Sequence, residues 1–221
     1  EIGDDLVLKC PDCHVLFIQR TLLSLHTKAA DFWSDGYRSD FFARAEPLIA
    51  RCPRCNDFFP LENGEVLFQL PPGKNYGEMT VLDGGEDYTP GDYLKALESS
   101  RCTGIEKDLR LRLLWRQNAE RRDVEGAIKP VMTAELHDNL ERLLEILGPE
   151  DLLLRSEVLR ELGDFEKSLK TLQAADGPWA DTICRECGER NILPVLVETA
   201  DEATPGYYPF PFNEDVFAFP S

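Results

Sequence analysis

Two cysteine pairs with the same spacing are the part of this sequence best suited to chemistry. Residues 9–14 and 51–56 each contain a Cys-Pro-x-Cys turn, which supplies Cys10, Cys13, Cys52 and Cys55. Two residues between the thiols let both sulfurs of one turn face a single point, and four thiolates complete a tetrahedral Zn²⁺ site. Four protein ligands leave no coordination position for water or substrate, so the sequence predicts a structural zinc ion.

Other chemistries of a Cys-x-x-Cys pair fit less well. The first pair is followed by His14 and so matches a c-type haem attachment, but the second, equivalent pair is better explained by zinc. Thioredoxin-like redox chemistry needs one pair at a helix N-terminus, whereas both pairs lie in sequence typical of strands and turns. Between Cys13 and Cys52 lie 38 residues, more than the roughly 15–20 of a compact zinc ribbon. We therefore expect an insertion around Trp33 between the two metal half-sites.

A third pair, Cys184 and Cys187, has a different setting. It has no proline, it follows residues 179–183 of helical character, and Gly188 stands where a helix would end. We expect two buried thiols on a helix rather than metal ligands. The spacing places neither Cys102, His26 nor His137 as a further ligand.

Short apolar runs predict a β-rich N-terminal half. Residues 6–8 and 15–18 form an expected hairpin with the first cysteine pair at its tip, and residues 47–50 and 58–61 flank the second pair. Asp35-Gly36 and Asn63-Gly64 each predict a further hairpin turn, since both dipeptides favour positive φ angles. Residues 71–88 are predicted to form a turn-rich linker.

Helical patterns follow the linker. Thr89-Pro90 predicts a helix start, residues 105–119 a second helix, and Thr133 the cap of a third helix that ends before Gly148-Pro149. Residues 150–162 and 164–175 predict a helix–turn–helix. Residues 160–169 resemble the turn of a tetratricopeptide repeat, although Ser168 stands where alanine is usual and no second copy is evident.

These patterns predict an α+β fold in three parts: a β-rich, zinc-ribbon-like domain with an insertion over residues 1–88, an α-helical, TPR-like region over 89–190, and an extended tail rich in aromatic residues and proline over 191–221. The six aromatics of residues 204–221 are costly to leave in water. The tail is expected to pack on its own protein, with docking to another chain as the alternative.

The charge limits the classes of partner. The chain has 41 acidic and 24 basic side chains, a formal net charge of −17. A protein with this negative charge repels phosphate backbones and anionic lipid surfaces, so the sequence predicts no binding to nucleic acid or to membranes. The same charge favours a basic protein partner. No apolar run is long enough to span a membrane. Six of the seven cysteines occur in closely spaced pairs, which favours metal binding in a reducing compartment, and we expect a cytoplasmic protein.

Residues 107–122 carry a local positive charge, although the chain as a whole is acidic. Six basic residues are set there against Asp108 and Glu120. We expect these cations to pair internally with the acidic surplus, and a groove for phosphate or carboxylate is the alternative. Neither a nucleophile–base pattern nor a phosphate loop is evident in the sequence.

The combination of motifs resembles a group of uncharacterised bacterial proteins. These join a Cys-Pro-x-Cys turn, a Trp-Ser-Asp-Gly segment (here residues 33–36), a second Cys-Pro-x-Cys turn and a TPR-like helical region. The resemblance covers residues 8–60 and 90–190 and implies neither an enzymatic activity nor a substrate. It also implies that residues 184–188 are helical.

The sequence thus favours a non-enzymatic, zinc-stabilised protein–protein interaction module, in a specific version an immunity or inhibitor protein that neutralises a basic partner. The alternatives are an enzyme with a site near the arginine-rich helix and a nucleic-acid-binding zinc ribbon.

Overall fold

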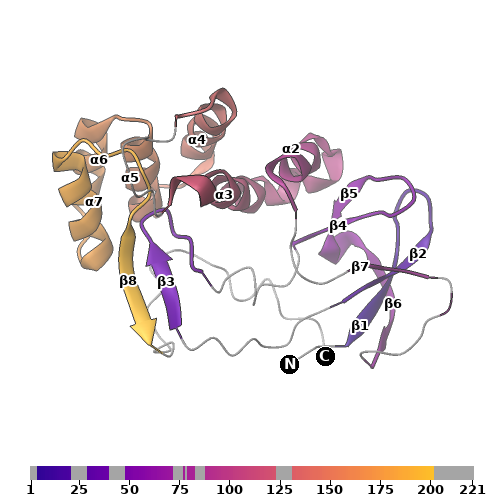
Figure 1. The fold of residues 1–221 in the computed structure, drawn as a ribbon. Helices are drawn as coiled ribbons and strands as arrows, with labels where there is room; N and C mark the ends of the chain where they lie inside the picture. Colours follow the sequence, from indigo (N-terminus) through magenta and orange to yellow (C-terminus); the bar gives the residue numbers. More distant parts are fainter. Residues whose placement is uncertain are drawn as a thin grey trace. The chain divides into compact units, whose positions relative to one another are not determined.

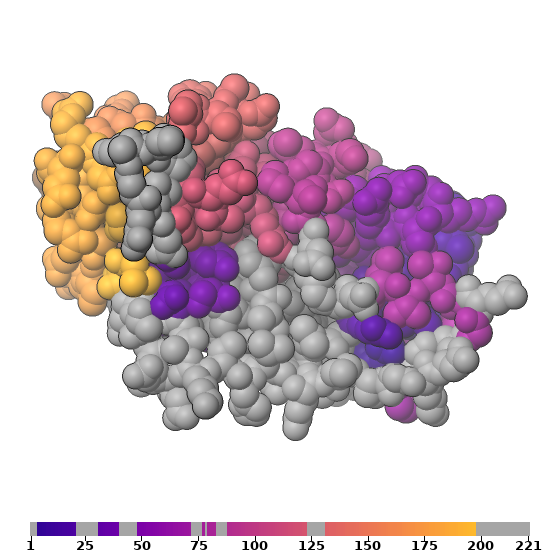
Figure 2. All heavy atoms as spheres, viewed as in Figure 1, coloured from indigo at the N-terminus to yellow at the C-terminus, as the bar shows by residue number. Residues whose placement is uncertain are grey.

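The computed structural model describes residues 4–20, 29–39, 48–71, 77, 79–82, 88–122 and 131–201, which are drawn in colour in Figure 1. Figure 2 shows the heavy atoms in the same view. Strands prevail before residue 88 and helices after it, so the predicted α+β class is confirmed. The tail beyond Asp201 lies outside the described residues.

The described residues divide into two compact units. The first contains Glu1–His26 and Asp40–Leu109, and the second contains Thr27–Ser39 and Arg110–Ser221. These boundaries differ from those expected at residues 88 and 190. The Trp33 segment, expected as an insertion of the metal domain, belongs to the helical unit, and the helix that begins at Pro90 belongs to the metal unit.

The first unit is built around a four-stranded sheet in the order β6-β1-β2-β7. β1 (Asp5–Lys9) and β2 (Leu16–Gln19) form the predicted antiparallel hairpin, β6 (Glu65–Leu70) pairs with β1 in antiparallel fashion, and β7 (Thr80–Leu82) runs parallel to β2. A separate hairpin, β4 (Ile49–Arg51) and β5 (Phe58–Pro60), flanks the second cysteine pair as predicted.

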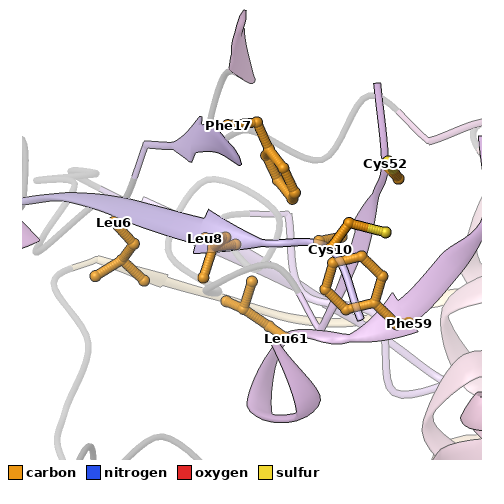
Figure 3. Packing of buried hydrophobic residues seen from close by; sticks show 8 residues of the cluster. Leu6, Leu8, Cys10, Phe17, Cys52, Phe59 and Leu61 are labelled. Atoms are coloured by element: carbon orange, nitrogen blue, oxygen red, sulfur yellow. The ribbon is translucent and has the colours of Figure 1, made fainter. Parts of the chain in front are cut away.

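One buried cluster joins the sheet to the second hairpin. Alternate residues of β1 point toward it, as the period of a strand requires. Figure 3 shows Cys10 at the end of β1 beside the ring of Phe59, which belongs to β5. The cluster comprises Leu6, Leu8, Cys10, Phe17, Ala50, Cys52, Phe59 and Leu61. Two of the four predicted ligands are therefore part of the hydrophobic core.

Helical segments pack against this hairpin. α2 (Pro90–Glu98) begins as predicted: the Thr89 hydroxyl accepts the Asp92 N–H at 3.3 Å, and the Asp92 carboxylate accepts the Thr89 N–H at 3.0 Å. This capping box satisfies two N–H groups that a helix start leaves without partners. The 3-10 helix η2 (Ser100–Ile105) follows, and the preceding Ser99 hydroxyl donates to the Phe58 carbonyl of β5 at 3.0 Å. α3 (Glu106–Gln117) then crosses the boundary between the units.

The second unit combines a two-stranded sheet with helices. β3 (Ala29–Trp33) and β8 (Leu196–Asp201) pair in antiparallel fashion and are drawn side by side in Figure 1. The short 3-10 helix η3 (Ala119–Arg121) follows α3. α4 (Ala134–Ile146) starts at the predicted cap, where the Thr133 hydroxyl accepts the Leu136 N–H at 3.2 Å. α5 (Leu152–Glu161), α6 (Phe165–Leu172) and α7 (Pro178–Gly188) pack on one another.

The turn between α5 and α6 confirms the predicted helix–turn–helix. Gly163 adopts φ of +83°, a conformation that glycine adopts without strain, and the Asp164 side chain caps α6. Ser156 and Ser168 face each other across the two helices, and each hydroxyl donates to the other residue's carbonyl, at 2.7 and 2.8 Å. A small residue at 168 thus permits a close approach of α5 and α6.

Two local predictions were wrong. Asn63-Gly64 does not form a hairpin turn, because β5 pairs with β4 and β6 with β1, while residues 61–63 form the 3-10 helix η1 (Leu61–Asn63). Gly64 has φ of −72°, so it is not in the left-handed region. The expected linker at 71–88 contains a strand, β7, whose pairing with β2 is a long-range contact.

Candidate metal centre

The two cysteine turns have matching backbone hydrogen bonds. In the first, the Cys10 N–H donates to the Val15 carbonyl at 3.0 Å and the His14 N–H to the Cys10 carbonyl at 3.1 Å. In the second, the Cys52 N–H donates to the Asp57 carbonyl at 2.9 Å and the Asn56 N–H to the Cys52 carbonyl at 3.0 Å.

The turns also share an unusual backbone conformation. His14 and Asn56 occupy the same place in the two turns, with φ of 57° and 59°. Non-glycine residues seldom adopt positive φ, and Asn and His are among those that tolerate it best. The matched geometry means that each turn presents its two sulfurs in the same way.

The turns bring the four predicted ligands together. Their sulfurs all lie within 4.8 Å of one another, and no disulfide joins them. Two sulfur contacts cross from one turn to the other: Cys10 to Cys55 at 3.7 Å and Cys13 to Cys52 at 3.5 Å. A tetrahedral ion with metal–sulfur bonds of about 2.3 Å requires sulfurs roughly 3.8 Å apart, so the spacing fits a four-thiolate metal site.

Backbone N–H groups favour negative charge on these sulfurs. The Asp12 N–H donates to Cys10 Sγ, and the N–H groups of Arg54 and Cys55 donate to Cys52 Sγ, each at 3.4 Å. Without metal, the Val15 N–H lowers the pKa of the Cys13 thiol to about 7, while loss of hydration raises the pKa of Cys55 to about 12. A metal ion must therefore displace protons from this cluster, and its uptake weakens as the pH falls.

An ion pair supports the first turn from η2. The Arg101 guanidinium contacts the Asp12 carboxylate and lowers its pKa. Asp57, after the second turn, has a raised pKa, chiefly through burial and also through its hydrogen bond with Asp12. Cys102 is buried with its thiol 3.9 Å from the Phe58 carbonyl and is not part of the four-sulfur cluster.

The third cysteine pair is helical, as predicted, and lies in α7. Neither thiol belongs to a group of potential metal ligands among the described residues. Cys187 is buried and its thiol donates to the Ser168 hydroxyl at 3.2 Å. Cys184 is exposed, so the expectation of two buried thiols was wrong for this residue. Side chains three positions apart on a helix point in directions that differ by about 60°. This difference is enough for Cys187 to face the core while Cys184 faces the solvent.

A second ligand group, not anticipated from the sequence, lies on the exposed side of α4. His137, Asp138 and Glu141 can bring one ligand atom each within 4.8 Å of the others, and His137 Nδ1 is 3.6 Å from a Glu141 carboxylate oxygen. The i, i+4 spacing of His137 and Glu141 was the sequence signal that would have indicated this neighbourhood.

The Trp33 segment is held in the second unit by buried polar groups. The Ser34 hydroxyl donates to Glu157 at 2.6 Å, and the Asp35 carboxylate accepts from Asn118 at 2.9 Å and from Arg122 at 2.5 Å. The Trp115 indole N–H donates to the Asp35 carbonyl at 3.0 Å. The Trp-Ser-Asp-Gly motif thus anchors β3 to the helices, a role that the sequence did not reveal.

A second part of this buried network lies between the helices and the chain that leads to β8. Arg121 donates to Glu161 at 2.6 Å and to the Ile192 carbonyl at 2.8 Å. Arg160 donates to Glu157 at 2.6 Å and to the Leu193 carbonyl at 2.9 Å. Internal pairing of the arginine-rich stretch is therefore confirmed for Arg121 and Arg122, both of which are buried.

A shallow hollow of about 490 Å³ lies where α4, α5 and α6 meet, lined by Leu147, Pro149, Leu152, Arg155, Lys170 and Thr171. The Arg155 guanidinium donates to the carbonyls of Leu144 and Leu147 at the end of α4, at 3.2 and 2.6 Å. Its role there is to cap a helix, since cations are favourable at helix C-termini.

Comparison with known proteins yields no match: no protein-family model, no curated protein and no solved structure is similar to this chain. Within the described residues, no helix combines the length and the apolar character needed to cross a lipid bilayer.

Proposed function

We propose that this chain is a non-enzymatic protein–protein interaction module whose N-terminal fold is stabilised by a structural Zn²⁺. The zinc part rests on the four free thiols, their spacing and their N–H donors. Zinc is the usual ion of a site with four thiolates, and it supplies folding energy there rather than a reactive water. Elemental analysis of the purified protein should give about one zinc per chain. Iron in its place, or a folded metal-free protein, would contradict this assignment.

The interaction role rests on one observation, the concentration of exposed apolar side chains on one sheet. Nine large hydrophobic residues are exposed in the described chain. Five of them belong to the sheet of the first unit: Leu16, Val66, Leu67, Phe68 and Val81. Three of the five, Val66, Leu67 and Phe68, are consecutive in β6, and grouped exposed apolar residues are typical of binding surfaces, whereas single ones are ordinary.

The charged residues favour a basic partner over an enzyme site at the arginine-rich helix. Arg121 and Arg122 are buried and engaged with Glu161 and Asp35, so their guanidinium groups do not line an open groove. The net charge of −17 speeds encounter with a cationic protein and repels a nucleic acid. Neutralisation of a basic protein by an inhibitor of this kind is one form of the proposed function.

Affinity capture with the full chain tests this proposal. We expect basic proteins to be retained at low salt and released by about 0.5 M salt, because the Debye length becomes short compared with the interface. Phe68→Ser should reduce capture, and Leu169→Ser, at an exposed position on α6 in the second unit, should not. Capture that neither salt nor Phe68→Ser alters would contradict the proposal.

A further inference from the structure

β6 is the most exposed strand of the first unit. It lies at one edge of the sheet, and no other described strand pairs with its outer side. Val66, Leu67 and Phe68 are 39%, 38% and 49% exposed. An edge strand carries N–H and C=O groups that point away from its sheet and can pair with another chain.

Four of the five exposed apolar residues of this sheet lie on its edge strands, and the fifth, Leu16, is the first residue of β2. The register places Phe68, Val7, Ile18 and Val81 in one row across the four strands. The two central residues, Val7 and Ile18, are fully buried, while Phe68 and Val81 at the ends of the row are exposed. The middle of the face is thus already covered, which favours addition of a strand over docking onto the face.

β6 has two of the features that protect edge strands, a charged residue at its start, Glu65, and a bulge. A shift in register between Val7 and Leu8 of β1 leaves Leu67 as an extra residue, which is a β-bulge. From Val66 to Leu70 the strand contains neither a charged residue nor proline, the residues that usually discourage pairing. The bulge bends the strand without covering its apolar side chains.

We propose that the outer edge of β6 binds an extended, basic segment of a partner protein as an added strand. This inference rests on the proposed interaction function and names its surface and the chemistry of its partner. Main-chain hydrogen bonds would supply affinity, and alternate apolar side chains of the segment would meet Phe68. The bulge places Val66, which pairs with Leu8, on the other face of the sheet.

The charge selects this occupant over a second copy of the chain. Glu62 of η1 and Glu65 at the start of β6 are exposed, and Glu65 is paired with Lys9 at 2.8 Å. The Glu62 carboxylate and the net charge of −17 favour lysine or arginine side chains on the added segment. Two copies of the chain would each bring a net charge of −17 to an antiparallel β6–β6 pair, and the like charges would oppose it.

A short blocked peptide of alternating lysine and valine is the probe. Titrated into the zinc-loaded full chain at low salt, this peptide should bind. The same peptide with N-methylated valines should have an affinity at least about tenfold lower, because it loses main-chain hydrogen-bond donors. A version with glutamate in place of lysine should not bind. These comparisons use the wild-type protein and do not depend on whether any variant folds.

Protein variants then locate the site. Phe68→Ser should weaken binding of the lysine–valine peptide by about tenfold, because a half-exposed ring no longer packs against the added strand. Leu169→Ser is the matched control and should bind like wild type. Zinc content should stay unchanged in both, which shows that the first unit is folded.

Four outcomes would overturn the inference: equal binding of the lysine and glutamate peptides, equal binding of the N-methylated peptide, no effect of Phe68→Ser, or binding that appears only after residues 202–221 are deleted. A concentration-dependent dimer that Phe68→Ser abolishes would likewise replace the partner with a second copy. If the peptide fails while capture of basic proteins succeeds, the interaction function stands and only its placement on β6 is wrong.

Discussion

At the residue scale, the four cysteines of the metal site differ from the other three in what surrounds them. Each ligand turn supplies N–H donors to sulfur and a left-handed residue after the second cysteine, His14 or Asn56. Cys102 and Cys187 are buried near a carbonyl and a hydroxyl, and burial raises the pKa of both thiols. Burial also raises the pKa of Cys10 and Cys55, so what distinguishes the ligand thiols among the described cysteines is that their four sulfurs lie within 4.8 Å of one another.

Replacing Cys52 with serine should remove the zinc. Cys52 is a buried member of both the sulfur cluster and the core, and three remaining thiolates do not close the site. We expect zinc to fall from about one equivalent to none and the β-rich unit to lose its fold, since structural zinc contributes on the order of 10 kcal/mol. Elemental analysis and circular dichroism measure both effects. Cys102→Ser, a buried cysteine of the same unit, should keep its zinc, and a zinc-loaded Cys52→Ser protein would show that another residue is the ligand.

Glu161 should make the stability of the second unit depend on pH. It is fully buried, and loss of hydration raises its pKa from 4.5 to about 7 despite the opposing effect of Arg121. Between pH 4.5 and about 7, Glu161 is therefore protonated in the folded state and ionised in the unfolded chain. The stability that this group contributes is fully present below pH 4.5 and is lost as the pH rises through about 7.

Comparison with Glu161→Gln isolates this effect, because glutamine does not titrate. The free energy of unfolding of wild type minus that of the variant should decrease by about 2 kcal/mol between pH values of about 5.5 and 7.5. Tryptophan fluorescence during urea unfolding measures it, and the exposed Glu145→Gln is the control. A difference that grows with pH would mean that Arg121 keeps Glu161 ionised in the folded state.

At the element scale, local capping explains where the helices begin, and close packing explains the turn that was predicted wrongly. Thr89, Thr133 and Asp164 each accept a backbone N–H at a helix start. Gly64 is different: a Cβ there would lie 3.1 Å from the Leu61 carbonyl oxygen and 3.1 Å from Cε2 of Phe59. This glycine is suited to a narrow space between η1 and the core and not to a hairpin turn.

Gly64→Ala should therefore destabilise the first unit, by about 1–2 kcal/mol, because a buried ring and a carbonyl must both move. Gly104→Ala is the matched control. Its added Cβ would meet nothing within 4 Å, and alanine restricts the unfolded chain more than glycine does. Gly104→Ala should leave stability unchanged or slightly raised. Urea unfolding followed by circular dichroism compares the two, and equal effects would contradict the crowding at Gly64.

At the scale of the whole molecule, the path of the chain couples the two units. The chain passes through the first unit, enters the second at β3, and returns to the first before it forms the helices. Residues 40–109 thus connect two parts of the second unit, and the metal half-sites lie on either side of β3. When the first unit is folded, this connection has fixed ends. When it is unfolded, the connection is a long flexible loop whose closure costs entropy.

Removal of the proposed zinc ion should consequently weaken the second unit, although the four candidate cysteine ligands all belong to the first unit. All three tryptophans, Trp33, Trp115 and Trp179, belong to that unit, so their fluorescence reports its unfolding. We expect a chelator to lower the stability measured this way by about 1–3 kcal/mol. The chelator should have no such effect on Cys52→Ser, which lacks zinc already. An unchanged tryptophan transition in the wild-type protein would show that the two units fold independently.

The sequence by itself determined the features that depend on near neighbours along the chain. Cys-Pro-x-Cys spacing identified the four clustered thiols, and Thr89-Pro90, Thr133 and Gly163 located helix ends, because turns and caps are made by residues a few positions apart. The tertiary structure decided the rest: the pairing of β3 with β8, the addition of β7 to the sheet, the burial of Asp35 among Asn118 and Arg122, and the exposure of β6 at an edge. Each of these depends on contacts between distant parts of the chain, and neither composition nor local spacing specifies which distant strand or helix a segment will meet.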